Sequence, residues 1–182
     1  MSLNYLIMKY YMNKLCVILF TLLVLVGFSS CETDENYYWK SGTLDIKFNL
    51  NIDHNGYGQA YTTVRITEIP QFNPSREDLI GIKTNDSWLT ISNLLRGDVI
   101  NRFYIEVPGV GVYAYETPIS IREDGAKITI DDNAYFNFMR NVNELLYRNG
   151  AVDMKITFYS NIYDGGPAYF DISNNLDLEV RD

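Results

Sequence analysis

Cysteine and histidine are scarce in this chain of 182 residues, which has two cysteines and one histidine. Cys16 lies inside a hydrophobic segment near the N-terminus, so the rest of the chain has only Cys31 and cannot form an internal disulfide. A zinc site built from histidine and cysteine ligands is not expected for the same reason. A Ser-His-Asp triad would have to use His54, which precedes the turn-forming pair Asn55-Gly56.

Basic residues are also few. The chain has 15 lysines and arginines against 23 aspartates and glutamates, a formal net charge of −8. The segment before Cys31 contains Lys9 and Lys14 and no acid, so the remainder has 13 basic and 23 acidic residues, or −10. A domain this acidic repels the phosphates of nucleic acids, and we expect no nucleic-acid partner.

The longest hydrophobic run is short. Residues 15–28 are apolar or uncharged throughout and follow directly on Lys14. Fourteen residues suit the core of a signal peptide and fall below the roughly 20 that a membrane-spanning helix needs. The alternative is a single-pass anchor that is never cleaved, and Met1, Met8 and Met12 all remain possible start sites.

The segment after this run is similar to a lipobox, the site at which signal peptidase II cuts before a cysteine. It reads Gly27-Phe28-Ser29-Ser30-Cys31, with Phe28 where leucine is usual. The resemblance implies that residues 1–30 are removed and that Cys31 carries acyl chains, palmitate among them. Residues 32–36 resemble the acidic export signal of surface-exposed Bacteroidota lipoproteins. Together they predict a protein anchored in the outer membrane by lipid. The acidic segment favours a domain that faces the cell exterior, and a domain that faces the periplasm is the alternative.

The rest of the sequence indicates a mostly β domain. Residues 31–42 read as an acidic tether, and residues 43–182 as one domain. Residues 44–52 alternate strictly between apolar and polar, as a strand with one wet face does. Six or seven further short strands with turn signals between them favour an antiparallel β-sandwich of the immunoglobulin-like kind.

One amphipathic helix is predicted near residues 133–149. Its apolar residues follow the helical spacing of three and four. Asp131 or Asp132 is expected to cap its start, and Gly150 to end it. The apolar positions are Tyr135, Phe138, Met139, Val142, Leu145 and Leu146.

The whole plan resembles the small immunoglobulin-like lipoproteins of Bacteroidota, with a signal, a lipobox, an acidic tether and one β-sandwich. The resemblance depends on residues 12–36 and on the strand pattern. It implies a fold and a location, and it assigns no functional residue.

The chain has 15 tyrosines and 2 tryptophans, more than a core of this size requires, and this excess is the most informative feature about ligand binding. Aromatic rings bury apolar area while their polar tips stay hydrated, which suits both sugar and protein ligands. The alternative for each ring is packing in the core or on a sheet. Aromatic residues expected in loops or on wet strand faces are Tyr37, Tyr38, Trp39, Tyr57, Tyr61, Tyr113, Tyr115, Tyr163 and Tyr169. From this set the ligand-binding candidates are Tyr37, Tyr38, Trp39, Tyr113, Tyr115 and Tyr163.

No catalytic residue, metal site or cofactor is predicted. Residues 131–133 and 53–55 offer oxygen ligands, but neither segment follows the EF-hand pattern. The sequence Arg96-Gly97-Asp98 is read as a plain turn.

The leading hypothesis is therefore a non-enzymatic, tethered binding module for a glycan or a protein. One alternative is a structural or accessory subunit of a fimbria-like surface assembly, which predicts a terminal strand that can be exchanged. Another is a hydrolase that uses a pair of carboxylates in a deep cleft.

Overall fold

The computed structural model describes residues 36–122 and 125–181. The signal peptide, the lipobox and Cys31 lie outside the described residues. The strands are β1 (Tyr37–Ile52), β2 (Tyr57–Arg65), β3 (Asp78–Ser92), β4 (Val99–Val107), β5 (Gly111–Tyr115), β6 (Ile119–Ser120), β7 (Gly125–Ile130), β8 (Ala151–Ser160) and β9 (Gly166–Arg181). A 3₁₀ turn, η1 (Ile66–Glu68), follows β2, and one helix, α2 (Asn133–Asn149), stands between β7 and β8.

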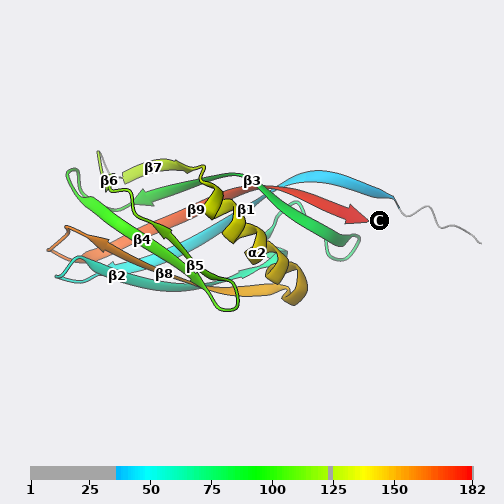
Figure 1. The fold of residues 1–182 in the computed structure, drawn as a ribbon, viewed down its shortest axis with the longest axis horizontal. Coiled ribbons are helices and arrows are strands. Elements are labelled where there is room, and N and C mark those ends of the chain that lie inside the picture. Colours follow the sequence, from blue (N-terminus) through cyan, green and yellow to red (C-terminus); the bar gives the residue numbers. More distant parts are fainter. Residues whose placement is uncertain (1–35, 123–124, 182) are drawn as a thin grey trace, which may run out of the picture. The chain divides into compact units, whose positions relative to one another are not determined.

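All strand pairs are antiparallel, and the order is β5-β4-β8-β2-β1-β9-β3-β7, with β6 beside β4. The sheet bends between β1 and β2. Those two strands pair only at Ile52 and Gly58, next to their turn, whereas β1 pairs with β9 from Tyr37 to Ile52. The bend produces two halves, β5-β4-β8-β2 and β1-β9-β3-β7 (Figure 1).

The two halves face each other across a hydrophobic core. Phe170 of β9 lies 5.3 Å from Phe158 of β8 and 6.1 Å from Phe103 of β4, measured between ring centroids. All three side chains are fully buried. The predicted antiparallel β-sandwich with one helix is thus confirmed.

The strand order within the sandwich is that of a jelly roll. Consecutive strands β1 and β2 fall in opposite halves, and so do β8 and β9. Immunoglobulin domains instead keep their first two strands in one sheet. Because β9 lies between β1 and β3 and pairs with both, the C-terminal strand is not at an edge of the sheet.

The helix α2 has the predicted bounds, and its ends have the predicted chemistry. Asp132 is the N-cap, and its carboxylate accepts a hydrogen bond from the backbone N–H of Tyr135 at 2.7 Å. Gly150 ends the helix in the left-handed conformation, with φ of 73°. The apolar side packs mainly on β3 and β8. Its buried residues are Tyr135, Phe138, Met139, Val142, Asn143 and Leu146.

The domain begins earlier than the sequence predicts. Residues 37–42, read as part of a tether, form the first part of β1 and pair with residues 176–181 of β9. Strand β3 is also longer than the short strands that the sequence predicts, because it continues from Ser92 back to Asp78 through two register shifts. The physical reason is the same in both cases: the added residues pair with the long strand β9, which no local pattern reveals.

Candidate functional site

One outward surface of the sandwich is rich in tyrosine. Strands β2, β8 and β4 turn alternate side chains into the core, and the remaining ones point outward on one side. We call this surface the tyrosine face. Its residues are Tyr57, Gln59, Tyr61 and Thr63 of β2, Asp153, Lys155, Thr157 and Tyr159 of β8, and Arg102, Tyr104 and Glu106 of β4.

The rings at one end of the tyrosine face contact each other across three strands. Tyr159 is opposite Tyr57 in the register, and their ring centroids are 5.5 Å apart, edge to face. Tyr104 meets Tyr159 on the other side, at 6.2 Å. The guanidinium of Arg102 lies 4.7 Å from the centroid of the Tyr159 ring, within the range of a cation–π contact. These contacts hold the rings in place before any ligand arrives.

A chain of hydrogen bonds runs along β2. The Tyr57 hydroxyl donates to Gln59 Oε1 at 2.7 Å, and Gln59 Nε2 donates to the Tyr61 hydroxyl. The Tyr61 side chain is 70% exposed. An amide held between two tyrosines presents a fixed polar group beside apolar rings.

A hollow of about 560 Å³ adjoins Tyr61. Two polar pairs border it: Lys155 Nζ with Glu106 at 3.2 Å, and the Thr63 hydroxyl donating to Asp153 at 2.6 Å. The hydrogen bond that Lys155 donates to Glu106 raises the pKa of Lys155, so the ammonium stays charged at neutral pH. The hollow is lined by Tyr61, Thr62, Thr63, Glu106, Pro108, Asp153, Met154 and Lys155.

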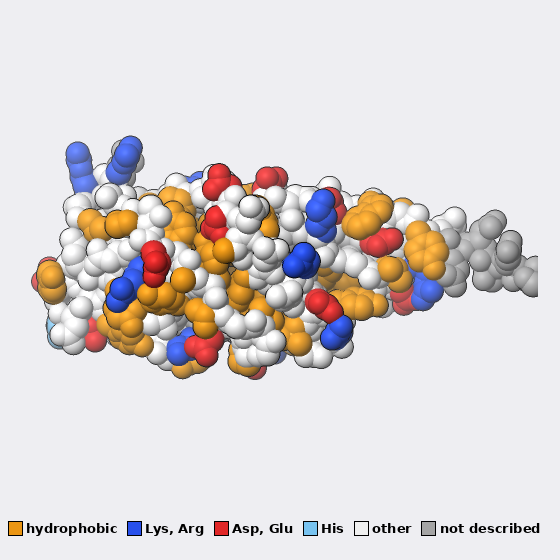
Figure 2. Space-filling model, viewed as in Figure 1, with side chains coloured by type: hydrophobic (Ala, Val, Ile, Leu, Met, Phe, Trp, Pro, Cys, Tyr) orange, Lys and Arg blue, Asp and Glu red, His pale blue; other side chains and the backbone are white. Residues whose placement is uncertain are grey.

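The hydrophobic side chains of this region are visible in Figure 2, where they gather over β4 and β8 at the left, with charged side chains among them. The outward surface of the other half is different. Along β1 and β9 it carries mainly polar and charged side chains such as Lys47 and Asp171, which are opposite each other in the register. Its aromatic members are Tyr37, Trp39, Tyr169 and Trp88, and Trp88 is covered by Lys127 at 5.1 Å. Tyr37 and Tyr169 are at opposite ends of this surface, whereas four tyrosines lie together on the tyrosine face.

The six predicted ligand-binding residues do not come together. Tyr37 and Trp39 are exposed at the start of β1, and Tyr163 is exposed in the turn between β8 and β9, at the other end of these strands. Tyr115 stacks on the buried Phe103, with ring centroids 5.0 Å apart.

The prediction that Tyr113 binds a ligand is wrong, because Tyr113 belongs to the core. Its side chain is 3% exposed, and its ring lies 5.0 Å from that of Tyr135. The hydroxyl donates to Asp132 at 2.5 Å. Burial, with this hydrogen bond to a carboxylate, raises the pKa of Tyr113. A buried ring with an occupied hydroxyl cannot serve a surface ligand.

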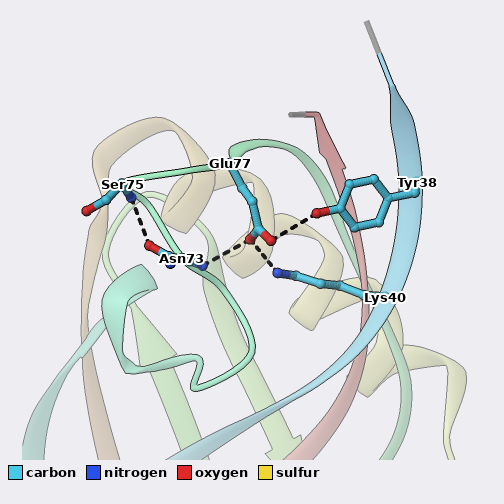
Figure 3. Close-up of polar contacts among 5 residues, drawn as sticks. All are labelled: Tyr38, Lys40, Asn73, Ser75 and Glu77. Carbon is cyan, nitrogen blue, oxygen red and sulfur yellow. Dashed lines mark hydrogen bonds and ion pairs between the residues drawn. The ribbon is translucent and has the colours of Figure 1, made fainter.

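Tyr38 has a structural contact in place of a ligand. Its hydroxyl donates to Glu77 Oε1 at 3.0 Å, Lys40 pairs with the other oxygen, and the backbone N–H of Asn73 donates to the same carboxylate at 3.0 Å (Figure 3). Glu77 is 13% exposed. The carboxylate thus attaches the loop before β3 to the beginning of β1.

Glu77 makes stability depend on pH. The hydrogen bond from Lys40, followed by that from Asn73, lowers the pKa of Glu77 from its ordinary 4.5. A carboxyl with a lowered folded-state pKa stabilises the fold above its unfolded pKa and loses that contribution as pH falls through the folded value. We expect Glu77→Gln to lower the free energy of unfolding by about 1–3 kcal/mol at pH 7, and the deficit to shrink below pH 4.5.

Urea titrations at several pH values measure this effect. Glu68→Gln is the matched control, since Glu68 is half exposed and 3.8 Å from Arg65, and such a pair contributes about 1 kcal/mol or less. A Glu77→Gln deficit that stays constant down to pH 3 would contradict the assignment.

The other polar candidates have local structural roles. His54 Nδ1 is 3.2 Å from the backbone oxygen of Tyr163. Asp53 accepts the backbone N–H groups of Asn55 and Tyr57, which lowers its pKa. Asp98 accepts the N–H of Leu95 at 2.7 Å, as expected of a turn. Among the residues that the structure describes, no group of three histidine, cysteine or acidic side chains is placed to hold a metal ion.

No helix within the described part of the chain is long and apolar enough to cross a membrane. No protein-family model and no curated protein matches the sequence.

Several solved structures have a distant likeness to this chain. A decameric BFDV capsid protein is 7% identical, with a TM-score of 0.43, and the match covers 79% of this chain and 99% of that one. Desmodium yellow mottle tymovirus is 10% identical, with a TM-score of 0.35 and coverages of 80% and 90%. TmCBM61, solved in complex with β-1,4-galactotriose, is 9% identical, with a TM-score of 0.30 and coverages of 77% and 86%. With TM-scores this low, none of these likenesses bears on the function of this chain.

Proposed function

We propose that this protein is a lipid-anchored envelope protein whose domain binds a glycan, without catalysis, through the tyrosine face. The observation that carries the binding proposal is the set of three tyrosine rings and one arginine in mutual contact on β2, β8 and β4. The order of these strands brings together residues from three distant parts of the sequence. Nothing in the core requires them, because they point away from it.

The chemistry of the face suits a sugar. A pyranose has an apolar face of C–H groups and a rim of hydroxyls, so it needs a flat ring to stack on and fixed polar groups beside it. Tyr61 offers an exposed ring, and Gln59, Asp153 and Lys155 offer donors and acceptors around it. Ligand sites generally combine apolar walls with a few placed polar groups in this way.

A binding role fits the carboxylates of the face better than hydrolysis does. Glu106 is paired with Lys155, and Asp153 accepts from Thr63. Both acids are exposed on the outward side of a sheet. A glycosidase instead needs one protonated and one ionised carboxyl on either side of the bond to be cut.

The anchor proposal is supported by the sequence before the domain. The run of residues 15–28 and the following Ser29-Ser30-Cys31 fit a cleaved lipoprotein signal. Each buried CH₂ of an acyl chain contributes about 0.8 kcal/mol, so more than one chain on Cys31 gives a stable attachment to the membrane. The expected location is the outer membrane, with the domain facing the cell exterior.

A glycan array with the mature protein tests the binding proposal. For a glycan that binds, Tyr61→Ala is expected to weaken the affinity by about tenfold or more, because the exposed ring is the stacking surface. Tyr169→Ala is the matched control, since it makes the same change on the opposite surface, where affinity should stay the same. Equal affinities of the two variants would refute the assignment of the face.

A further inference from the structure

Two aromatic side chains at the start of β1 form a second exposed group. Tyr37 and Trp39 are two residues apart on one strand, so they lie on the same outward side, and they are 54% and 59% exposed. We call them the tether-end pair. They are separate from the tyrosine face, which lies on β2, β8 and β4.

The tether-end pair is close in the chain to the predicted lipid attachment. Tyr37 is the sixth residue after Cys31. An extended chain spans at most about 3.3–3.6 Å per residue, so Tyr37 can be no more than about 22 Å from an acylated Cys31. We infer that Tyr37 and Trp39 insert into the headgroup region of the bilayer. This inference depends on the proposed lipid anchor and is independent of the glycan site.

The chemistry of the pair fits a lipid surface. Tyrosine and tryptophan are the residues that gather at membrane interfaces, because their rings are apolar and their polar atoms stay hydrated. The lipid anchor also holds the rings near the bilayer and so raises their effective concentration at its surface. Even a weak preference of each ring for the interface is then sufficient for insertion.

The charged side chains around Tyr37 and Trp39 also bear on contact with a lipid bilayer. The domain as a whole is acidic, which would repel anionic headgroups. At this end, however, Arg181 is paired with Asp78 at 2.7 Å, and Lys40 is paired with Glu77. Glu77 and Asp78 therefore each have a basic partner, and Glu179, opposite Trp39 on β9, is the further carboxylate of the described residues beside the rings.

The strand that carries Tyr37 and Trp39 is held in place by contacts on its inward side and by its pairing with β9. The inward neighbours of the pair on β1, Tyr38 and Lys40, are both bound to Glu77. On the strand itself, Tyr37 is opposite Arg181 and Trp39 is opposite Glu179 in the ladder with β9. The backbone beneath the rings is thus part of the sheet, and contact with the bilayer would set the orientation of the domain on the membrane.

Tryptophan fluorescence of the acylated mature protein in phosphatidylcholine and phosphatidylglycerol vesicles tests this contact. The chain has two tryptophans, so Trp88→Phe leaves Trp39 as the only reporter, and Trp39→Phe leaves Trp88 as the matched control. Their partners on β9, Glu179 and Ser173, are six residues apart, which places the two rings about 20 Å from each other along the strand. Bromine-labelled lipids quench only rings that they touch.

We expect Trp39 to lose most of its emission in brominated vesicles and to shift to the blue relative to detergent-free buffer, while Trp88 keeps its emission. Protein that carries the acyl chains and floats with the vesicles, but shows equal Trp39 emission in brominated and ordinary lipid, would overturn the contact and leave the anchor intact. Protein whose mass shows no acyl chain would overturn the anchor and the contact together, without affecting the glycan proposal.

Discussion

Replacing Phe170 by alanine should lower the free energy of unfolding by about 3–5 kcal/mol, because the ring is fully buried between the two halves of the sandwich. It is the ring of β9 that meets Phe158 and Phe103 from the opposite half. Its loss leaves a cavity between sheets that are held apart by their backbones, so neighbouring side chains can fill it only partly.

Urea unfolding of the mature chain, followed by tryptophan fluorescence, measures this change. Tyr169→Ala is the control, since Tyr169 directly precedes Phe170 on β9 and points outward; we expect a change of about 0.5 kcal/mol or less. If Phe170→Ala does not fold, Phe170→Leu should fold with a smaller loss of about 1.5 kcal/mol. A Phe170→Ala protein as stable as Tyr169→Ala would contradict the sandwich packing.

The second large effect is expected at Asn174, a fully buried polar residue of β9. Its Oδ1 accepts hydrogen bonds from the hydroxyls of Ser87 at 2.7 Å and Tyr135 at 2.8 Å. Its Nδ2 donates to the backbone oxygen of Leu44 at 3.3 Å. The residue thereby joins β1, β3, β9 and α2, and burial raises the pKa of Tyr135 in this group.

Asn174→Leu keeps the volume of the side chain and removes its polar atoms. We expect a loss of about 3–5 kcal/mol in the free energy of unfolding, since each buried polar group left without a partner costs about 1–3 kcal/mol. The triple variant Asn174→Leu, Tyr135→Phe and Ser87→Ala should recover part of that loss, because it removes the orphaned hydroxyls as well. A triple variant less stable than the single one would show that the hydrogen bonds are not the cause.

Periodicity in the sequence was sufficient for the elements with strong local patterns. The alternation in residues 44–52 places Leu44 and Phe48 in the core, as found. The helical spacing in residues 133–149 gives α2 with its caps, because those signals lie within a few residues of each other. Long-range pairing gives no such signal. The polar residues Ser87 and Asn174 interrupt the apolar pattern of their strands, although both point inward.

The phase of a strand was harder to predict than its existence. In β5 the sequence offers Val112 and Tyr113 as alternatives for the core, and polarity alone favours the valine. The structure buries Tyr113 and leaves Val112 60% exposed. The reason is tertiary: Asp132, which caps α2, accepts the Tyr113 hydroxyl, and the ring packs on Tyr135.

The tyrosine face could be anticipated only in part. Tyr57 and Tyr61 were expected to be on a wet surface, and they are outward on β2. Their inward neighbours, Gly58 and Ala60, are small, so the alternation there is weak. A Cβ on Gly58 would lie 2.1 Å from the Phe158 ring, which explains why glycine stands at that position. The contributions of β4 and β8 depend on strand pairing across about a hundred residues, which the sequence does not reveal.

The most direct measurement of the central claim is a ¹⁹F NMR titration of the mature protein, labelled with 3-fluorotyrosine, with a glycan selected on the array. Tyrosine-to-phenylalanine variants assign the resonances. We predict saturable shifts at Tyr57, Tyr61 and Tyr159 and none at Tyr169. Binding of the glycan with shifts confined to tyrosines outside the tyrosine face would contradict the account.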